Sequence, residues 1–236
     1  MGRVLGDVLD VSLGEPLPSL TMGSPRIVYG VCVGSWGRFN DNVVTAETEQ
    51  LIALSGQTSI ARAYREIQRV ALGLSADILI LQHDDLEITD PDAEAKIIEA
   101  IKGGADLVGV AGGGSDGGIA WWNQNPIGHQ RTDVGEIDFG VRAGDVQALE
   151  GSLIAMSRWA IESGVMFDNR YPGFHGYDAD ICRQVFTNTF LEPRDRRVTV
   201  VDIDTHHHTQ MGFKSAQSHE DWLTADRIFR DKWRLA

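Results

Sequence analysis

The chain has 236 residues, of which 42% are hydrophobic and 23% charged, a composition typical of globular proteins that excludes a disordered chain or a fibre. Its 21 Lys and Arg residues against 34 Asp and Glu residues give a net charge of −13, which argues against nucleic acid as a partner. Two cysteines exclude a disulfide framework, the apolar runs are too short to cross a membrane, and we expect a cytoplasmic protein.

The first half of the chain alternates between strands and helices. Residues 1–25 lack periodicity, and we expect an N-terminal arm there. Strands are then predicted over 27–33, 50–54, 77–81 and 107–111, and helices over 58–74, capped by Thr58 or Ser59, and over 90–103, beginning at Asp90-Pro91. Such alternation predicts a parallel sheet flanked by helices, in which residues 26–111 form a nucleotide-binding half.

The second half, 112–236, is less regular, and we expect it to form the acceptor half and a C-terminal helix. Residues 112–148 are rich in Gly and polar residues, and this length favours a binding loop or flap. We then predict a strand and a short helix over 152–164, a helix over 177–190, a strand over 198–203, and a last helix opened by Ser218-His219-Glu220-Asp221. Residues 26–236 are expected to form a single domain.

Two pairs of acidic residues stand at the ends of predicted elements. Asp84 and Asp85 follow the strand 77–81, at the sheet edge where open α/β folds bind ligands, and carboxylate oxygens suit Mg²⁺ or Mn²⁺. Asp178 and Asp180 open the helix that begins at Tyr177. Taken alone, a solvated turn explains the first pair, and stabilisation of a helix dipole explains the second.

Three consecutive histidines, His206-His207-His208, follow the strand 198–203. Neutral imidazole is a good ligand for Mn²⁺ and its neighbours. Because successive side chains of an extended segment point to opposite sides, one or two of the three can reach a single ion. A polar loop with adjacent histidines is the alternative.

Together these motifs resemble GT-A glycosyltransferases close to family 2, especially a small bacterial and phage branch whose acidic motif begins with His. The resemblance covers about residues 26–234 and is carried by Ser59–Tyr64, His83–Ile88, Phe167-Asp168 with Gly173–Asp180, and the late His with Lys232-Trp233. It implies an α/β fold with a mixed, mostly parallel sheet flanked by helices. The implied activity is metal-dependent, inverting transfer of a sugar from a nucleoside diphosphate sugar, by default a UDP-sugar, to a hydroxyl of a protein, glycan or small molecule, which is a hexosyltransferase reaction.

The resemblance also implies roles for particular residues. Asp85 and His208 would bind Mn²⁺ or Mg²⁺ on the donor diphosphate, and Asp178 would be the general base. Such an ion would also reverse the local field of an acidic cleft. The residues implied in donor binding lie at two strand ends, on the following helix and beside Asp85, and are Val33, Gly34, Ser35, Ser55, Gln57, Ser59, Arg62 and Asp84.

Three positions depart from the family pattern. Gln82-His83 stands where the first acid is common, Arg65 where Asn is common, and Tyr177 where an acid often precedes the catalytic Asp. These changes bear on metal affinity, on helix contacts and on the pKa environment of Asp178.

Two other functions compete with glycosyl transfer. A nucleotidyltransferase would carry a Gly-rich basic loop after the first strand, which Gly34–Arg38 matches only in part. A non-catalytic binding protein would keep the fold and use the arm, or a loop carrying Trp121 and Trp122, for assembly. The arm would equally serve a homo-oligomer.

Overall fold

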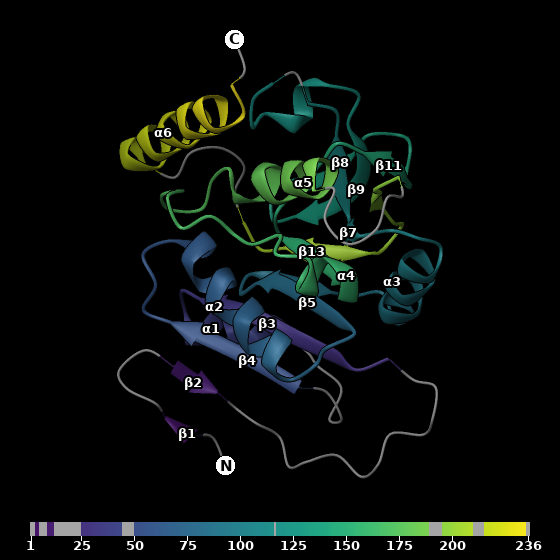
Figure 1. Ribbon diagram of the computed structural model, residues 1–236, viewed down its shortest axis with the longest axis vertical. Coiled ribbons are helices and arrows are strands. Elements are labelled where there is room, and N and C mark those ends of the chain that lie inside the picture. Colours follow the sequence, from purple (N-terminus) through teal and green to yellow (C-terminus); the bar gives the residue numbers. More distant parts are fainter. Residues whose placement is uncertain are drawn as a thin grey trace.

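The computed structural model describes residues 25–43, 50–115, 117–188, 195–209 and 215–234, and the backbone of 3–4 and 9–11. Within these residues the main sheet has nine strands (Figure 1). Their spatial order is β1 (Arg3–Val4), β2 (Leu9–Val11), β4 (Gln50–Ser55), β3 (Ile27–Val33), β5 (Ile78–His83), β13 (Leu153–Ser157), β7 (Leu107–Gly109), β14 (Val198–Val200) and β11 (Gly144–Val146).

The main sheet is mixed, as expected, but it is not mostly parallel, because five of its eight strand pairings are antiparallel. β3 is parallel to both β4 and β5, and β14 is parallel to β7. β13 lies between β5 and β7 and is antiparallel to both. The predicted strands are therefore present, but a strand from the second half of the chain separates two strands of the first half.

Part of the segment 112–148 is regular, so the prediction of a continuous loop is wrong there. It contributes to a second sheet with the order β12 (Ala148–Leu149), β8 (Ala111–Gly113), β9 (Ile127–Thr132), β15 (Thr205–His207) and β6 (Leu86–Ile88). β10 (Gly135–Asp138) pairs with β9 as a hairpin, and η1 (Trp121–Asn123) is a short 3₁₀ helix. The helix α1 (Trp36–Asn42) was not predicted either.

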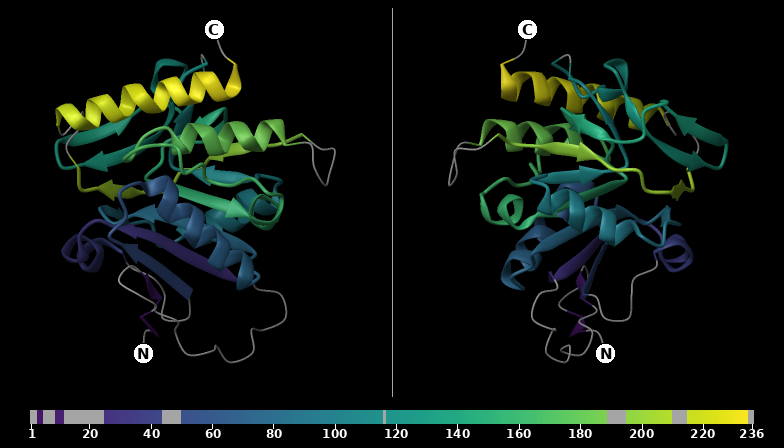
Figure 2. Two further views of the ribbon diagram at one scale, coloured as in Figure 1. Left: turned by 60° about the vertical axis from the view of Figure 1, so that its left-hand side comes forward. Right: turned by 90° about the vertical axis from the view of Figure 1, so that its right-hand side faces the viewer.

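Helices cover both faces of the main sheet. α2 (Ile60–Gly73), α4 (Arg158–Glu162), α5 (Tyr177–Thr187) and α6 (Ala216–Trp233) contribute to one buried cluster, and α3 (Ala93–Lys102) to another. Along β5, Leu79 and Leu81 belong to the first cluster and Ile78 and Ile80 to the second, because successive strand residues face opposite sides. Figure 2 shows α5 and α6 stacked at one end of the molecule.

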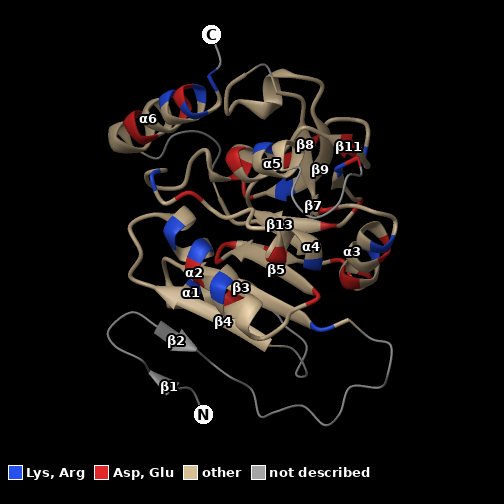
Figure 3. Cartoon of the chain, in the orientation of Figure 1, with Lys and Arg blue, Asp and Glu red and all other residues tan. Residues whose placement is uncertain are grey.

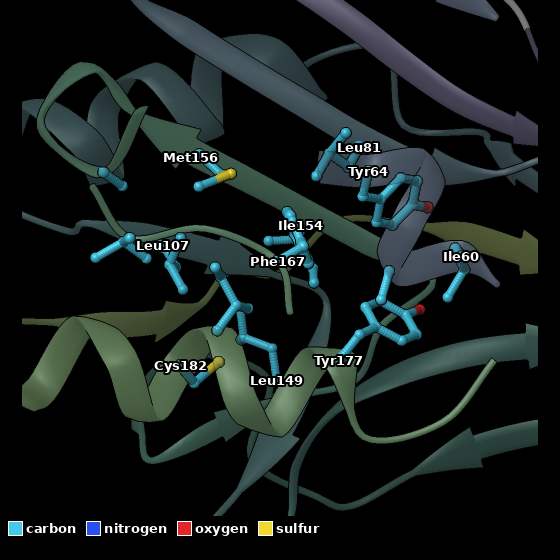
Figure 4. Close-up of a cluster of buried hydrophobic side chains, with 14 of the residues drawn as sticks. Ile60, Tyr64, Leu81, Leu107, Leu149, Ile154, Met156, Phe167, Tyr177 and Cys182 are labelled. Atoms are coloured by element: carbon cyan, nitrogen blue, oxygen red, sulfur yellow. The ribbon is translucent and has the colours of Figure 1, made fainter. Parts of the chain in front are cut away.

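Three aromatic rings join α2 to the start of α5. The ring of Tyr64 lies 5.4 Å from that of Phe167 and 5.7 Å from that of Tyr177, both in edge-on geometry, which is favourable for aromatic pairs. Figure 4 shows the hydroxyls of Tyr64 and Tyr177 on the same side of this cluster. The core therefore sets where α5 begins.

Several ends differ from the predicted ones. Ser59 precedes α2, but its hydroxyl donates to the Tyr171 carbonyl at 2.7 Å instead of capping the helix. α6 is capped by Ser215, whose hydroxyl accepts from the Ser218 amide at 3.1 Å, three residues before the predicted opening.

The described pieces of the arm extend the main sheet. β2 pairs antiparallel with β4, and β1 with β2, while the rest of the predicted arm before residue 25 lies outside the described residues. Among the helices described here, none combines the length and apolar character needed to cross a membrane.

Candidate active site

Asp85 is the second residue after β5 and lies between two histidine rings. Its Oδ1 is 3.1 Å from Nε2 of His207 and 3.8 Å from Nδ1 of His83. Burial opposes ionisation of Asp85, but the hydrogen bond from His207 outweighs burial and holds the pKa of its carboxyl well below the usual range. A carboxylate and two imidazoles thus meet at one point.

The pairing of β15 with β6 decides which histidine reaches Asp85. His207 pairs with Leu86 and His206 with Glu87, so the two rings lie on opposite faces of the strand. His208 touches Asp85 through its backbone, donating its amide to the Asp85 carbonyl at 2.7 Å. Its ring lies 3.4 Å from Glu87 and 3.3 Å from Asp133, so the structure brings His207, and not the ring of His208, to Asp85.

The contacts of His83 define its tautomer. The hydroxyl of Tyr177 donates to the Gly151 carbonyl at 2.9 Å, which uses its only proton. Nε2 of His83 lies 2.8 Å from that hydroxyl and must therefore donate to it. The lone pair of Nδ1 is then directed to Asp85, and burial lowers the pKa of His83, which favours this neutral form.

This donor set fits a divalent cation of the first transition row. Two imidazole nitrogens and one carboxylate oxygen suit Mn²⁺ or its neighbours. Ligand bonds of about 2.1 Å place adjacent donor atoms roughly 3.0–3.4 Å apart. The 3.1 Å between His207 and Asp85 lies within that range, and the 3.8 Å between His83 and Asp85 is slightly longer. His83, Asp85 and His207 are thus the residues that would hold such an ion.

Asp178 lies in the first turn of α5, one residue after Tyr177. The helix follows Gly176, whose φ of 77° is in the left-handed region that favours glycine, and Oδ1 of Asp178 accepts from the Ala179 amide at 2.9 Å. Burial raises the pKa of Asp178 to about 7, and the charge of Glu150 acts in the same direction. A carboxylate with this pKa is suited to proton transfer near neutrality.

Asp180 has a structural role, unlike Asp178, although both residues belong to the same motif. It is fully buried and accepts hydrogen bonds from Lys232 at 2.8 Å and from the Trp233 indole at 3.1 Å. Gln184 also donates to it at 2.7 Å. Asp180 therefore connects α5 to α6.

Asp84 is bound to the loop that follows β3. Its Oδ2 accepts from the amides of Gly34 at 2.8 Å and Ser35 at 2.7 Å, and its Oδ1 lies 3.1 Å from the Arg38 guanidinium. These two amides would belong to the phosphate loop of a nucleotidyltransferase, and here they bind a carboxylate of the protein itself. These hydrogen bonds to Asp84 thus hold the loop at Gly34 and Ser35 against the end of β5.

The other residues that the sequence implied in binding of the sugar donor lie at or near the same edge of the main sheet. The register pairs Val33 with Ser55, and Gln57 donates to the Ser55 carbonyl at 3.5 Å. Ser59 is buried against the loop at Tyr171. Arg62 is exposed on α2 and has no ion-pair partner within the part of the chain that the structure describes.

Sequence analysis missed several residues near Asp85. His83 was noted as part of the acidic motif and as a departure from the family pattern but not as a metal ligand, although an imidazole is itself a suitable ligand type. Glu150 accepts from the amide and the hydroxyl of Ser152, and it follows an irregular segment that gave no signal. The Tyr64 hydroxyl is buried, with no hydrogen-bond partner among the described residues.

No family model matches the chain. It is 27% identical to the streptomycin biosynthesis protein StrF of Streptomyces griseus over 207 residues, which cover 83% of this chain and 70% of StrF. Among solved structures, A197 from STIV has a TM-score of 0.50 at 14% identity, covering 78% of this chain and 86% of A197. GalNAc-T7, solved with UDP, GalNAc and Mn²⁺, has a TM-score of 0.56 at 11% identity, covering 89% of this chain and 48% of GalNAc-T7.

The chain has a GT-A fold. In this GT-A fold, the carboxyl ends of the parallel strands β3, β4 and β5 carry Val33, Ser55 and His83. The predicted fold class is thereby confirmed.

Proposed function

We propose that the protein transfers a sugar from a nucleoside diphosphate sugar to an acceptor hydroxyl, with inversion at the anomeric carbon. One observation carries this proposal: Tyr177 links a candidate cation ligand to the turn of α5 that contains the candidate base. Its hydroxyl binds His83, and the next residue in the chain is Asp178. The fold and the similarity to StrF support a nucleotide-sugar substrate.

The divalent cation would be held by His83, Asp85 and His207. It would supply positive charge that offsets the charge developing on the nucleoside diphosphate as the sugar leaves. In the proposed site His207 takes the place that the sequence assigned to His208. The Mn²⁺ bound by GalNAc-T7 and the net charge of −13 both favour a cation at this position, because an acidic protein otherwise repels a diphosphate.

Asp178 would act as the general base. Its carboxylate removes the proton of the acceptor hydroxyl while that oxygen forms a bond to the anomeric carbon. The bond from that carbon to the diphosphate breaks on the opposite side, which inverts the configuration. A hexose and a uridine base are the default donor parts. Val33, Ser55 and Gln57 would line the nucleoside, and Arg62 would reach the phosphates.

Thermal unfolding with nucleoside diphosphates, nucleotide sugars and triphosphates, each with and without Mn²⁺, tests the proposal. A ligand that binds the native state raises the melting temperature. We expect UDP or another diphosphate to stabilise the protein in the presence of Mn²⁺. Asp85→Asn should abolish this rise, whereas Asp41→Asn, the same change at an exposed residue of α1, should leave it intact.

Two results would contradict glycosyl transfer, and a third would contradict the proposed cation site. A shift only with triphosphates, together with pyrophosphate release from a sugar phosphate and a triphosphate, would indicate a nucleotidyltransferase. Stabilisation by a nucleotide sugar without hydrolysis or transfer to a panel of sugar and peptide acceptors would indicate a binding protein. An equal rise in Asp85→Asn would remove Asp85 from the cation site.

A further inference from the structure

A buried chain of hydrogen bonds leads away from His207 on the side opposite Asp85. Nδ1 of His207 lies 3.2 Å from Oε1 of Gln130. Nε2 of Gln130 donates to the Ser152 hydroxyl at 2.9 Å, and that hydroxyl in turn donates to Glu150. We call Gln130, Ser152 and Glu150 the Gln130 network.

The direction of each hydrogen bond in the network follows from the carboxylate of Glu150, at which the network ends. An ionised carboxylate only accepts, so Ser152 must donate its hydroxyl proton to Glu150. The Ser152 oxygen then accepts from the amide nitrogen of Gln130. This orientation turns the amide oxygen of Gln130 to His207, and Nδ1 of His207 must carry the proton.

Burial and backbone contacts hold the network in this arrangement. Ser152 is 0% exposed and Gln130 6%, so water does not compete for their hydrogen bonds. The Ser152 carbonyl also accepts from the His83 amide at 2.9 Å. In the parallel pairing of β9 with β15, His207 lies opposite Thr132, and Gln130, two residues before Thr132, is on the same face of β9.

We propose that Gln130 is a positioning residue that, through Ser152 and Glu150, keeps a proton on Nδ1 of His207, so that Nε2, which faces Asp85, is the nitrogen that binds the cation. A histidine that ligates a metal needs this arrangement, because its other nitrogen donates to a protein acceptor that fixes the ring. Tyr177 does the same for His83 on the other side of Asp85. The inference rests on the proposed cation site, and it adds that Gln130 sets the cation affinity of that site.

The test is a titration of the purified protein with Mn²⁺, in which electron paramagnetic resonance counts the unbound ion. Gln130→Met removes the acceptor for Nδ1, and we expect Mn²⁺ binding about 10–100-fold weaker, the usual effect of losing such a partner. Gln130→Glu keeps an acceptor for Nδ1 of His207 and should bind Mn²⁺ at least as tightly as the wild type. Ser152→Ala removes the acceptor of the Gln130 amide nitrogen, so the amide can rotate by about 180°. Mn²⁺ should then bind more weakly than in the wild type.

A matched control comes from Gln68, a buried residue of α2 whose amide donates to the Val165 carbonyl at 2.6 Å. Gln68→Met also loses a buried amide, but it should bind Mn²⁺ as the wild type does. If Gln130→Met binds like the wild type while Asp85→Asn loses binding, the network has no positioning role. Equal weakening in Gln130→Glu and Gln130→Met would assign the effect to packing and would also overturn the inference. If the wild type binds no better than Asp85→Asn, the proposed cation site itself is wrong.

Discussion

The carboxylate of Asp178 offers the most direct test of the proposed chemistry. Asp178→Asn keeps the size of the side chain but removes its capacity to accept a proton. We expect the turnover rate to fall by about 10²–10⁴-fold, the usual contribution of a general base, while donor affinity stays nearly unchanged. Steady-state kinetics combined with calorimetric titration of UDP checks this. A variant with full turnover would remove Asp178 from the role of base.

The raised pKa of Asp178 predicts the pH dependence of the reaction. The base must be ionised, and its pKa is about 7. We expect kcat/KM to fall about tenfold per unit of pH below 7 and to level off above it. Rates measured between pH 5 and 9 test this. A flat profile from pH 5 to 7 would mean that another group removes the proton.

The residues nearest the predicted chemistry could be read from the sequence only in part. The roles of Asp85 and Asp178 come from the resemblance to GT-A glycosyltransferases, and their places after a strand and at the start of a helix agree with it. The choice between His207 and His208 could not be made, because three identical neighbours carry no pattern and a shift of one residue in the β15 register exchanges the faces. Gln130 and Glu150 lie in irregular sequence, and only the tertiary structure brings them to His207.

At the scale of elements, replacing Asp by Asn is expected to change the stability of the protein in opposite directions at Asp178 and at Asp180 of α5. The pKa of Asp178 in the folded state, about 7, lies above its ordinary value of 3.8. Folding is therefore favoured by the protonated Asp178 carboxyl. This contribution to stability is fully present below about pH 4 and is lost as the pH rises through 7. Asp178→Asn escapes this loss and should be more stable than the wild type at pH 8, with a difference that shrinks towards pH 4.

Asp180→Asn weakens hydrogen bonds to Lys232 and Trp233. Bonds to charged groups contribute about 1.5–3 kcal/mol each, and Lys232 keeps a second partner, Asp168, at 3.0 Å. We expect a loss of about 2–3 kcal/mol. Urea unfolding of both variants at pH 8 and pH 4 tests the pair, and equal shifts in the two variants at pH 8 would contradict it.

Regular elements were predictable where local patterns agree with the fold. The strand 27–33 is a continuous apolar run, the helix α2 has apolar residues at helical spacing, and the structure has both. The hairpin β9–β10 was missed because Gly and polar residues conceal its alternation. The place of β13 was not predictable, since no local signal says that it enters the sheet between β5 and β7.

Across the whole molecule, basic and acidic side chains are interspersed, and several basic ones lie along α2 (Figure 3). Arg65 donates to the Phe167 carbonyl at 3.0 Å, and Arg69 lies 3.3 Å from Glu66. Arg62 has no ion-pair partner within the described ranges. In a protein of net charge −13, an arginine left in this state is available to a phosphate.

We therefore expect Arg62→Gln to raise the KM for the nucleotide-sugar donor by about 10–100-fold, since a charge-assisted hydrogen bond contributes about 1.5–3 kcal/mol. The turnover rate should change little. Arg69→Gln makes the same change at a paired arginine of the same helix and serves as the control. Equal KM values for the two variants would exclude Arg62 from donor binding.

The position of β13 has a consequence for how the chain folds. β5 and β7 precede it in sequence but do not pair with each other, and each borders β13 in the finished sheet. When residues up to 111 have left the ribosome, both strands still carry unpaired edges, which tend to aggregate. The gap closes only after Leu153–Ser157 has been synthesised. A fragment that stops at 111 should therefore be insoluble, and folding should depend on contacts distant in sequence, which slows it.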